Sequence, residues 1–561
     1  MSSQYQSSAD HVPQAQARDD KPYPPYYYLW HLCTLGVLRA ERVDGSPCPR
    51  IVGTVWDDLD TECGSEAYHP ATIAMIDVGV GHNHPNLMQV DMGRAIDLVT
   101  HRYGARRRPI VADGDLHSEK KLAFFDNLSI EGLDLRSFSE DEQKALTSFV
   151  NELKESRGVV RMTEALDAAL PSHGTAVAGL AVGDPGLVFN GDGGVPEPVS
   201  LQDFVKQGPK GRPLSIRNNV VPYVGVDPFS KLVPIKTSFD EDPRPLMAAL
   251  LYAYKIGSDV ILMPRDIPDP TRGILTVKEE QSAQECQNGS ASGAIRRDES
   301  ATRDEWTILK KLLISISKKI PIVCAAGNSG ESQLIYPACL AGEGADGKET
   351  NGIIAVGAVN ADGCRAGYSN YGEGLTVVAP SNDGEIYNRY QARIDWGNPA
   401  TKLHQYGLGS LQEIPYSHYT IATTDLPGAW GYAGGSVPYV ANLPPEKNPG
   451  FAGGYYTGFG GTSAAAGLIA GVVALMSRAH KAYAGSDARL SGIEAKTTLM
   501  AAANLRPERL QSQSDEARGF EFKPDPMNSE VEAKGDPILF FGAGLVDAAE
   551  AIKKVRSLGK V

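Results

Sequence analysis

The sequence contains no hydrophobic run long enough to cross a membrane as a helix. Its longest apolar run, Ala464 to Met476, has 13 residues, whereas a membrane-spanning helix needs about 20. The first apolar stretch, Tyr26 to Leu38, is rich in aromatic residues and follows no basic segment of the kind that begins a secretory signal. We therefore expect no membrane partner and no secretory signal.

Cysteine and positive charge are both scarce. The seven cysteines are an odd number without metal-ligand spacing, which favours a reducing, cytoplasmic compartment over a disulfide framework. The net charge of −14 argues against a nucleic-acid partner, because binding phosphates requires a clustered basic surface. His82 and His84 have no third ligand nearby, so we predict no metal site there.

Internal repeats are also absent, and what is present is the pattern of a large α/β domain. Apolar β-rich runs alternate with amphipathic helical patterns, which predicts a mostly parallel sheet covered by helices. Strands are predicted at 71–76, 231–236, 258–263, 320–326, 352–358 and 375–379. Three helix starts are indicated by capping-box pairs, in which Ser or Thr precedes Glu by three residues: Ser139 with Glu142, Thr302 with Glu305, and Ser491 with Glu494.

Long polar or glycine-rich stretches interrupt this pattern near 91–165, 184–220, 267–301 and 382–455. Stretches of this length are normally functional or disordered, and none has enough patterned apolar residues to form a domain of its own. We therefore expect one domain over 51–561 that carries large insertions, preceded by an N-terminal extension over 1–50.

Two residues could supply the carboxylate and the base that a serine needs for acyl transfer. Asp77 directly follows the predicted strand 71–76, where a side chain faces the cleft of an α/β sheet, although a turn-forming aspartate would look the same. His173 lies in the motif SHGT at 172–175. Small residues follow it, which predicts a closely packed helix with the imidazole in its first turn.

Two further residues could supply the nucleophile and a donor for the oxyanion. Ser463 lies in GGTS at 460–463, at the start of the apolar helix, where the helix dipole favours developing negative charge. An ordinary N-cap serine is the alternative. Asn328 follows a strand in AAGN at 325–328; its amide could donate to an oxyanion, or the segment could be a simple turn.

Together, in the order Asp, His, Asn, Ser, these residues resemble the subtilisin-like serine proteases, whose triad order is Asp, His, Ser. The resemblance covers about 71 to 551. It is carried by IDVG at 76–79, HPNL at 84–87, HGT at 173–175, GVDP at 225–228, KLVPIK at 231–236, AAGN at 325–328, YSNYG at 368–372, VAP at 378–380, GTS at 461–463 and GAGLVDA at 542–548.

The resemblance implies a three-layer α/β fold, with a mostly parallel central sheet, and a serine endopeptidase acting on protein or peptide substrates. Asp77, His173 and Ser463 would form its triad, and Asn328 would donate to the oxyanion. Ala325, Ala326 and Gly327 would line the substrate site. The chemistry would need no cofactor. Relatives often bind structural calcium, but the sequence has no Asp-x-Asp-x-Asp-Gly loop, so calcium binding stays open.

The largest departure from the family pattern is Pro264-Arg265-Asp266, where relatives have small or apolar residues in the wall of the substrate pocket. Pro264 has no N–H to donate. We hypothesise that Asp266 favours a basic residue before the scissile bond; the alternative is that Arg265 and Asp266 both point to solvent.

Three questions of function stay open on the sequence. A catalytically idle peptide-binding scaffold and an acyl transfer to an amine, giving ligation or cyclisation, are alternatives to hydrolysis. Only 76 residues precede Asp77, which leaves no room for a full inhibitory propeptide. We therefore expect control by the insertions, above all 382–455, or by a regulatory partner protein.

Overall fold

The computed structural model describes residues 29–41, 50–64, 69–81, 84, 86–98, 124–155, 160–161, 171–185, 187–189, 196–198, 223–238, 242–267, 299–342, 351–360, 363–382, 421–426, 456–505 and 535–558. Within these residues the largest sheet has ten strands. Their spatial order is β15 (Ala503–Asn504), β16 (Leu545–Val546), β12 (Leu375–Pro380), β11 (Ile353–Val359), β10 (Ile322–Ala325), β9 (Val260–Met263), β3 (Thr72–Asp77), β8 (Lys231–Lys236), β4 (Ile96–Asp97) and β5 (Val160–Arg161).

Every neighbouring pair from β16 to β4 is parallel, and only the outermost pairs, β15–β16 and β4–β5, are antiparallel. The carboxyl ends of β3, β8, β9 and β10 therefore meet at one edge of the sheet. In the described part of the chain three smaller pairs lie outside it: β1 (Leu38–Glu41) with β2 (Arg50–Thr54), β6 (Leu187–Phe189) with β7 (Pro196–Pro198), and β13 (Ile421–Thr424) with β14 (Tyr456–Phe459).

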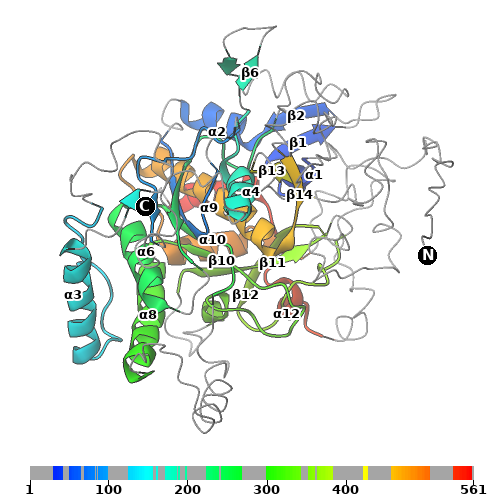
Figure 1. Cartoon of the computed structure of the whole chain (residues 1–561). Coiled ribbons are helices and arrows are strands. Elements are labelled where there is room, and N and C mark those ends of the chain that lie inside the picture. Colours follow the sequence, from blue (N-terminus) through cyan, green and yellow to red (C-terminus); the bar gives the residue numbers. More distant parts are fainter. Residues whose placement is uncertain are drawn as a thin grey trace, which may run out of the picture.

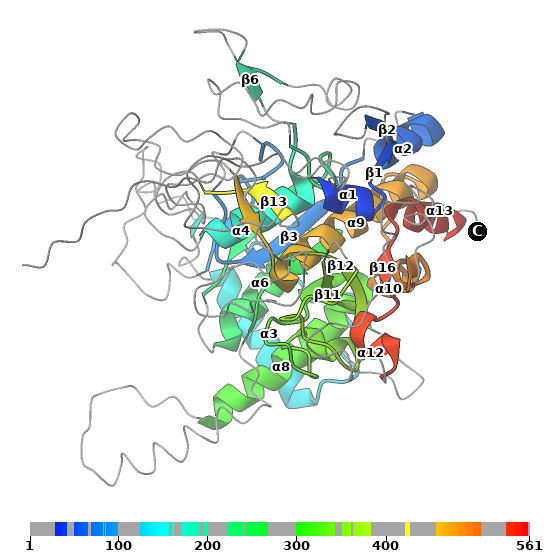
Figure 2. The same cartoon turned by 90° about the vertical axis from the view of Figure 1, so that its right-hand side faces the viewer.

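Helices lie on both faces of the sheet (Figures 1 and 2). On one face α9 (Gly461–Ala484) packs across β3 and β9 to β12, and α2 (Val55–Cys63), α4 (Pro171–Val182) and α13 (Ala548–Leu558) pack on α9. On the other face lie α6 (Pro243–Lys255) and α8 (Glu299–Lys319), with α3 (Glu140–Glu155) outside α8. The other helices within the described ranges are α1 (Trp30–Thr34), η3 (Ala338–Gly342), α10 (Gly492–Ala501) and α12 (Pro537–Phe541).

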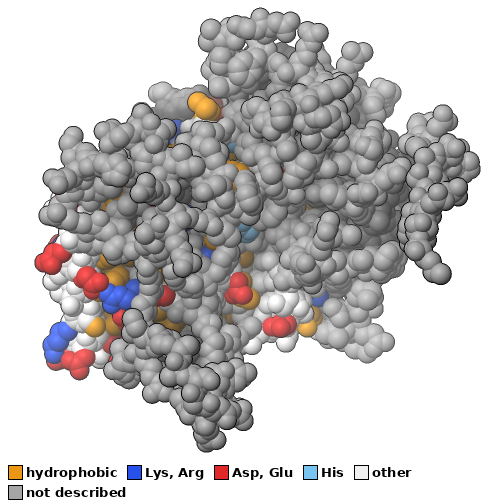
Figure 3. Space-filling view, in the orientation of Figure 1, with side chains coloured by type: hydrophobic (Ala, Val, Ile, Leu, Met, Phe, Trp, Pro, Cys, Tyr) orange, Lys and Arg blue, Asp and Glu red, His pale blue; other side chains and the backbone are white. Residues whose placement is uncertain are grey.

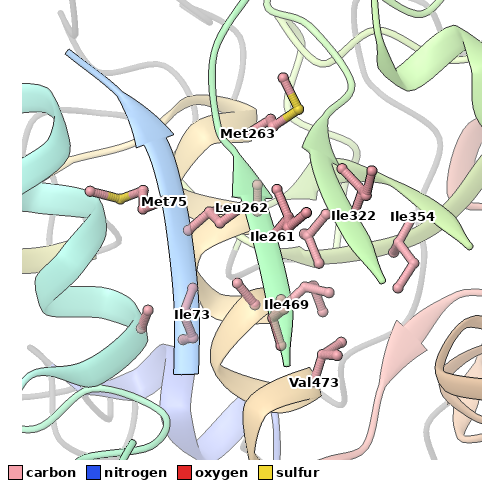
Figure 4. Packing of buried hydrophobic residues seen from close by; sticks show 14 of the residues in the cluster. Ile73, Met75, Ile261, Leu262, Met263, Ile322, Ile354, Ile469 and Val473 are labelled. Atoms are coloured by element: carbon pink, nitrogen blue, oxygen red, sulfur yellow. The ribbon is translucent and has the colours of Figure 1, made fainter. Parts of the chain in front are cut away.

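The core between the sheet and α9 is formed mainly by apolar side chains. Figure 4 shows Ile73 of β3, Ile261 and Leu262 of β9, and Ile469 and Val473 of α9 among the core residues, and all five side chains are fully buried. Ile261 and Leu262 are adjacent in β9, so their side chains lie on opposite faces of the sheet. At about 25 cal/mol per Å² of apolar area, burial of this kind is the main stabilising term of the fold.

Small residues let α4 and α9 approach each other closely. A Cβ on Gly467 would lie 3.1 Å from Val177 Cγ1 of α4, and a Cβ on Gly471 would lie 2.5 Å from Val226 Cβ. Any larger side chain at Gly471 would force the backbones apart. The packing therefore fixes the helix that carries His173 directly against the helix that carries Ser463.

The predicted parallel sheet with helices on both faces is confirmed. Strand 231–236 was predicted with its exact bounds, and the capping boxes at Ser139 and Ser491 are formed. The prediction that α8 begins at Thr302 is wrong, because this helix begins at Glu299. Glu and Ala are good helix formers, so the turn before Thr302 contains nothing that stops the helix.

The apolar run at 464–476 lies in α9, which is long and apolar enough to cross a membrane but has its apolar window completely buried inside the protein. Residues 29–38, from the N-terminal segment, are also part of the core, and Ala548 N–H donates to the Leu35 carbonyl at 2.9 Å.

On the surface, charged side chains gather at the left edge of the face in Figure 3, where Figure 1 places α3.

Candidate active site

Asp77 and His173 meet at the carboxyl edge of the sheet. Asp77 is the last residue of β3 and is 1% exposed, and His173 lies in the first turn of α4. His173 Nδ1 lies 2.8 Å from Asp77 Oδ2, and Asp77 Oδ1 accepts a hydrogen bond from the Val78 N–H at 2.7 Å. With Nδ1 held by the carboxylate, the imidazole has Nε2 left for a proton transfer.

The imidazole ring is also held from the side. Its edge packs against the Phe459 ring, with 5.7 Å between ring centroids. Phe459 is the last residue of β14, and β14 pairs with β13, whose Thr423 and Thr424 hydroxyls donate to the Ala176 and Thr175 carbonyls of α4. The β13–β14 hairpin therefore connects the two helices that carry His173 and Ser463.

Ser463 lies in the first turn of α9 and is 4% exposed. Its Oγ donates to the Pro264 carbonyl at 2.6 Å. Among the hydrogen bonds of the described residues, none joins Ser463 Oγ to His173 Nε2. The structure thus brings the serine, the histidine and the aspartate to one edge, with the serine hydroxyl turned toward the segment that follows β9.

Asn328 lies beside Ser463, and its amide orientation is fixed by its neighbour Thr462. Asn328 Oδ1 accepts from the Thr462 N–H at 2.8 Å and from Thr462 Oγ1 at 2.9 Å. Because a backbone N–H can only donate, Oδ1 must face Thr462, and Nδ2 therefore faces away. Thr462 Oγ1 in turn accepts from the Gly327 N–H at 3.1 Å, which ties the strand end to α9.

The predicted substrate-site residues of the oxyanion strand, Ala325, Ala326 and Gly327, are all buried at the end of β10. Gly327 has φ = +115°, a conformation that suits glycine. Cys324 directly precedes them, and burial raises the pKa of its thiol, so this cysteine stays protonated and is not a competing nucleophile.

The segment after β9 separates its two charges. Arg265 is 6% exposed, and its guanidinium donates to Thr237 Oγ1 at 2.8 Å and to the Ser238 carbonyl. Asp266 is exposed. The alternative that both charges point to solvent is therefore wrong for Arg265, because hydrogen bonds at the end of β8 hold its guanidinium in the interior.

Sequence reasoning missed the residues that hold the turn before Ser463. Tyr368 Oη and Asn382 Oδ1 accept from the Gly461 N–H at 3.1 and 3.4 Å, and Ser381 Oγ donates to the Gly461 carbonyl at 2.9 Å. The motif YSNYG contained a signal, since it matches the family, but nothing in its spacing showed which backbone atoms these side chains would reach.

Of the His82–His84 pair, only His84 lies among the described residues. His84 is buried, accepts from the Asn86 N–H at 3.0 Å, and packs against the Tyr456 ring. No group of three or more His, Cys, Asp or Glu in the described residues could hold a metal ion.

Two curated proteins match short stretches of the chain. A thermostable alkaline protease of Halalkalibacterium halodurans is 34% identical over 104 residues, which are 18% of this chain and 26% of that protein. Subtilisin BL of Lederbergia lenta is 41% identical over 64 residues, 11% of this chain and 20% of that protein. The chain thus matches about a quarter or less of the length of these relatives.

Solved structures are similar over a larger share of the chain. A lanthipeptide protease has a TM-score of 0.43 and 13% identity, covering 94% of each chain. The epidermin leader peptide processing serine protease of Staphylococcus aureus has a TM-score of 0.43 and 16% identity, covering 89% of this chain and 79% of that one. Finally, residues 69–520 match the subtilase family model. Because this match spans most of the 561 residues, the chain belongs to the subtilase family.

Proposed function

We propose that this subtilase is a serine endopeptidase that hydrolyses peptide bonds through an acyl-enzyme on Ser463. The observation that carries the proposal is the 2.8 Å hydrogen bond between His173 Nδ1 and Asp77 Oδ2, formed at the sheet edge where α9 presents Ser463. Asp77 would fix the histidine tautomer and stabilise the imidazolium, as the carboxylate of a serine triad does.

In the first step Ser463 Oγ attacks the carbonyl carbon of the scissile bond and gives its proton to His173 Nε2. For this transfer Oγ must exchange its hydrogen bond to Pro264 for one to His173, a rotation about the Cα–Cβ bond. The imidazolium then protonates the departing amine. Water, deprotonated by the same imidazole, hydrolyses the acyl-enzyme and restores the serine.

The oxyanion formed in each step would be held by Asn328 Nδ2 and the Ser463 backbone N–H. The contacts of Asn328 Oδ1 to Thr462 support this role, because they turn Nδ2 away from Thr462. Donors fixed in this way need no reorganisation when charge develops, which is why they lower the barrier.

Asp266 remains our candidate for substrate preference. It is exposed two residues after Pro264, whose carbonyl contacts Ser463 Oγ, while the charge of Arg265 is withdrawn into the interior. This arrangement supports a preference for a basic residue before the scissile bond. Cleavage-site profiling tests it: large apolar residues at this position, unchanged in Asp266→Ala, would refute it.

Regulation and location are also part of the proposal. The stretch 382–455 contains β13 and ends directly before β14, and this strand pair contacts α4 and leads into α9. We propose that this insertion, or a partner protein bound to it, controls access, that the enzyme works in the cytoplasm, and that the chemistry needs no cofactor. Replacing residues 427–455 by a short turn would leave substrate access unchanged if this account of control is wrong.

A fluorophosphonate probe on the full chain tests the activity itself. We expect covalent labelling of the folded protein and none of Ser463→Ala or of heat-denatured protein. Labelling that persists in Ser463→Ala would show that another residue is the reactive nucleophile. No labelling of the folded wild type, in buffer or in cell lysate, would favour an idle scaffold. Either result would contradict the proposed function. The mass of the product from a peptide substrate separates hydrolysis from transfer to an amine.

A further inference from the structure

The turn that precedes Ser463 has no cap of its own. Only Gly460 separates β14 from α9, and as the N-cap residue it has no side chain to accept a hydrogen bond from the first turn of the helix. Gly461 follows with φ = +77°. The first N–H groups of a helix have no partner within the helix, so the Gly461 N–H needs an acceptor from elsewhere in the chain.

Tyr368 supplies the nearer acceptor from a distant segment, and Asn382 Oδ1 is the second one, at 3.4 Å. Its Oη lies 3.1 Å from the Gly461 nitrogen. The same oxygen lies 2.8 Å from Ser381 Oγ and 2.7 and 2.9 Å from the carbonyl and side-chain oxygens of Asn382. The single phenolic proton goes to one of these three acceptors, which leaves an oxygen lone pair aimed at Gly461.

The Gly461 carbonyl oxygen is held as well. Ser381 Oγ donates to the Gly461 carbonyl at 2.9 Å, so the Tyr368–Ser381–Asn382 cluster contacts both backbone polar atoms of one residue. Gly460 fits against the cluster so closely that a Cβ on it would lie 1.6 Å from Asn382 Oδ1. The cluster therefore fixes the position of the backbone two residues before Ser463.

We propose that the Tyr368 hydroxyl is a positioning residue for the acyl-transfer site. It would act through Gly461, by holding the turn in the conformation that aligns Ser463 Oγ with His173 and the Ser463 N–H with Asn328 Nδ2. The inference deepens the proposed function and rests on it, because a positioning role has meaning only if Ser463 reacts.

Tyr368→Phe removes only the hydroxyl and keeps the ring. Loss of this bonded group should slow fluorophosphonate labelling and kcat on a peptide substrate by about 3- to 10-fold, the range expected for one hydrogen bond. KM should stay within about 2-fold, because the substitution keeps the aromatic ring. Tyr483→Phe is the matched control: its Oη bonds to Glu62 at the far end of α9, and its labelling rate should equal that of the wild type.

A wild-type labelling rate in Tyr368→Phe, or an equal loss in Tyr483→Phe, would overturn the inference. If the wild type itself does not label, the proposed function has failed, and amide hydrogen exchange still decides the structural part. Exchange at Gly461 should be faster in Tyr368→Phe by 10-fold or more and unchanged in Tyr483→Phe. Equal exchange in all three proteins would overturn the inference without any assay of activity.

Discussion

His31 should make the fold sensitive to acid. Its side chain is fully buried in α1, and neither ring nitrogen has a hydrogen-bond partner among the described residues. Burial lowers the pKa of His31 from 6.5 to about 3, because the charged imidazolium would lose its hydration without gaining a partner. The ring is therefore neutral in the folded protein at pH 7.

The sign of the effect follows from proton binding. Between pH 6.5 and 3 the unfolded chain binds a proton at His31 and the folded chain does not, so stability falls as the pH falls through this window. At pH 4.5 the unfolded state gains two pH units of protonation free energy, which is about 2.7 kcal/mol. Above pH 7.5 the contribution vanishes.

Urea unfolding of the wild type and of His31→Leu at pH 7.5 and 4.5 measures this contribution. Carboxylates titrate in both proteins, so the difference between their pH dependences isolates His31. We expect the wild type to lose about 2.7 kcal/mol more than His31→Leu between the two pH values. Equal losses in the two proteins would refute the reasoning, since they would mean that the buried ring accepts a proton without cost.

Three further predictions concern the site and the core. Asn328→Leu should lower kcat about 100- to 1000-fold with little change in KM, a magnitude known from the oxyanion asparagine of subtilisin itself rather than worked out from this structure; a kcat within 3-fold of the wild type would exclude the assigned role. Arg478→Met should cost about 3–5 kcal/mol in urea unfolding, because it leaves Asp227 charged and unpaired in the core; restored stability in the double variant with Asp227→Asn is the check. The pKa of Lys496 is lowered by burial to about 8, so stability should rise between pH 8 and 10.5, where only the unfolded chain keeps the proton, and thermal unfolding of Lys496→Met should lack that rise.

The sequence predicted the frame of this protein well, because its strands are short apolar runs and its helices have local start signals. No polar residue lies between Lys231 and Lys236, so the bounds of this strand could be predicted. The start of α8 was not, because a capping pair inside a run of good helix formers does not stop the helix. Local signals fix a boundary only when nothing upstream can extend the element.

The details of the site were less accessible. Asp77, His173, Ser463 and Asn328 could be named from motifs, but the turn of Ser463 Oγ toward Pro264 depends on contacts between segments almost 200 residues apart. The buried position of Arg265 could not be predicted either, since the hydroxyl and the carbonyl that accept its hydrogen bonds follow a different strand. Pairings of this kind follow from the fold and not from spacing.

The β13–β14 hairpin separates a segment whose length can vary from the side chains of the candidate site, whose positions are fixed. Its register, from Ile421 opposite Phe459 to Thr424 opposite Tyr456, closes the ends of the intervening segment whatever that segment contains. Doubling the length of a loop closed in this way costs only about 0.6 kcal/mol. New sequence can therefore accumulate between the two strands without displacing the imidazole or the serine, which makes this hairpin a place where selectivity can evolve while the reaction stays the same.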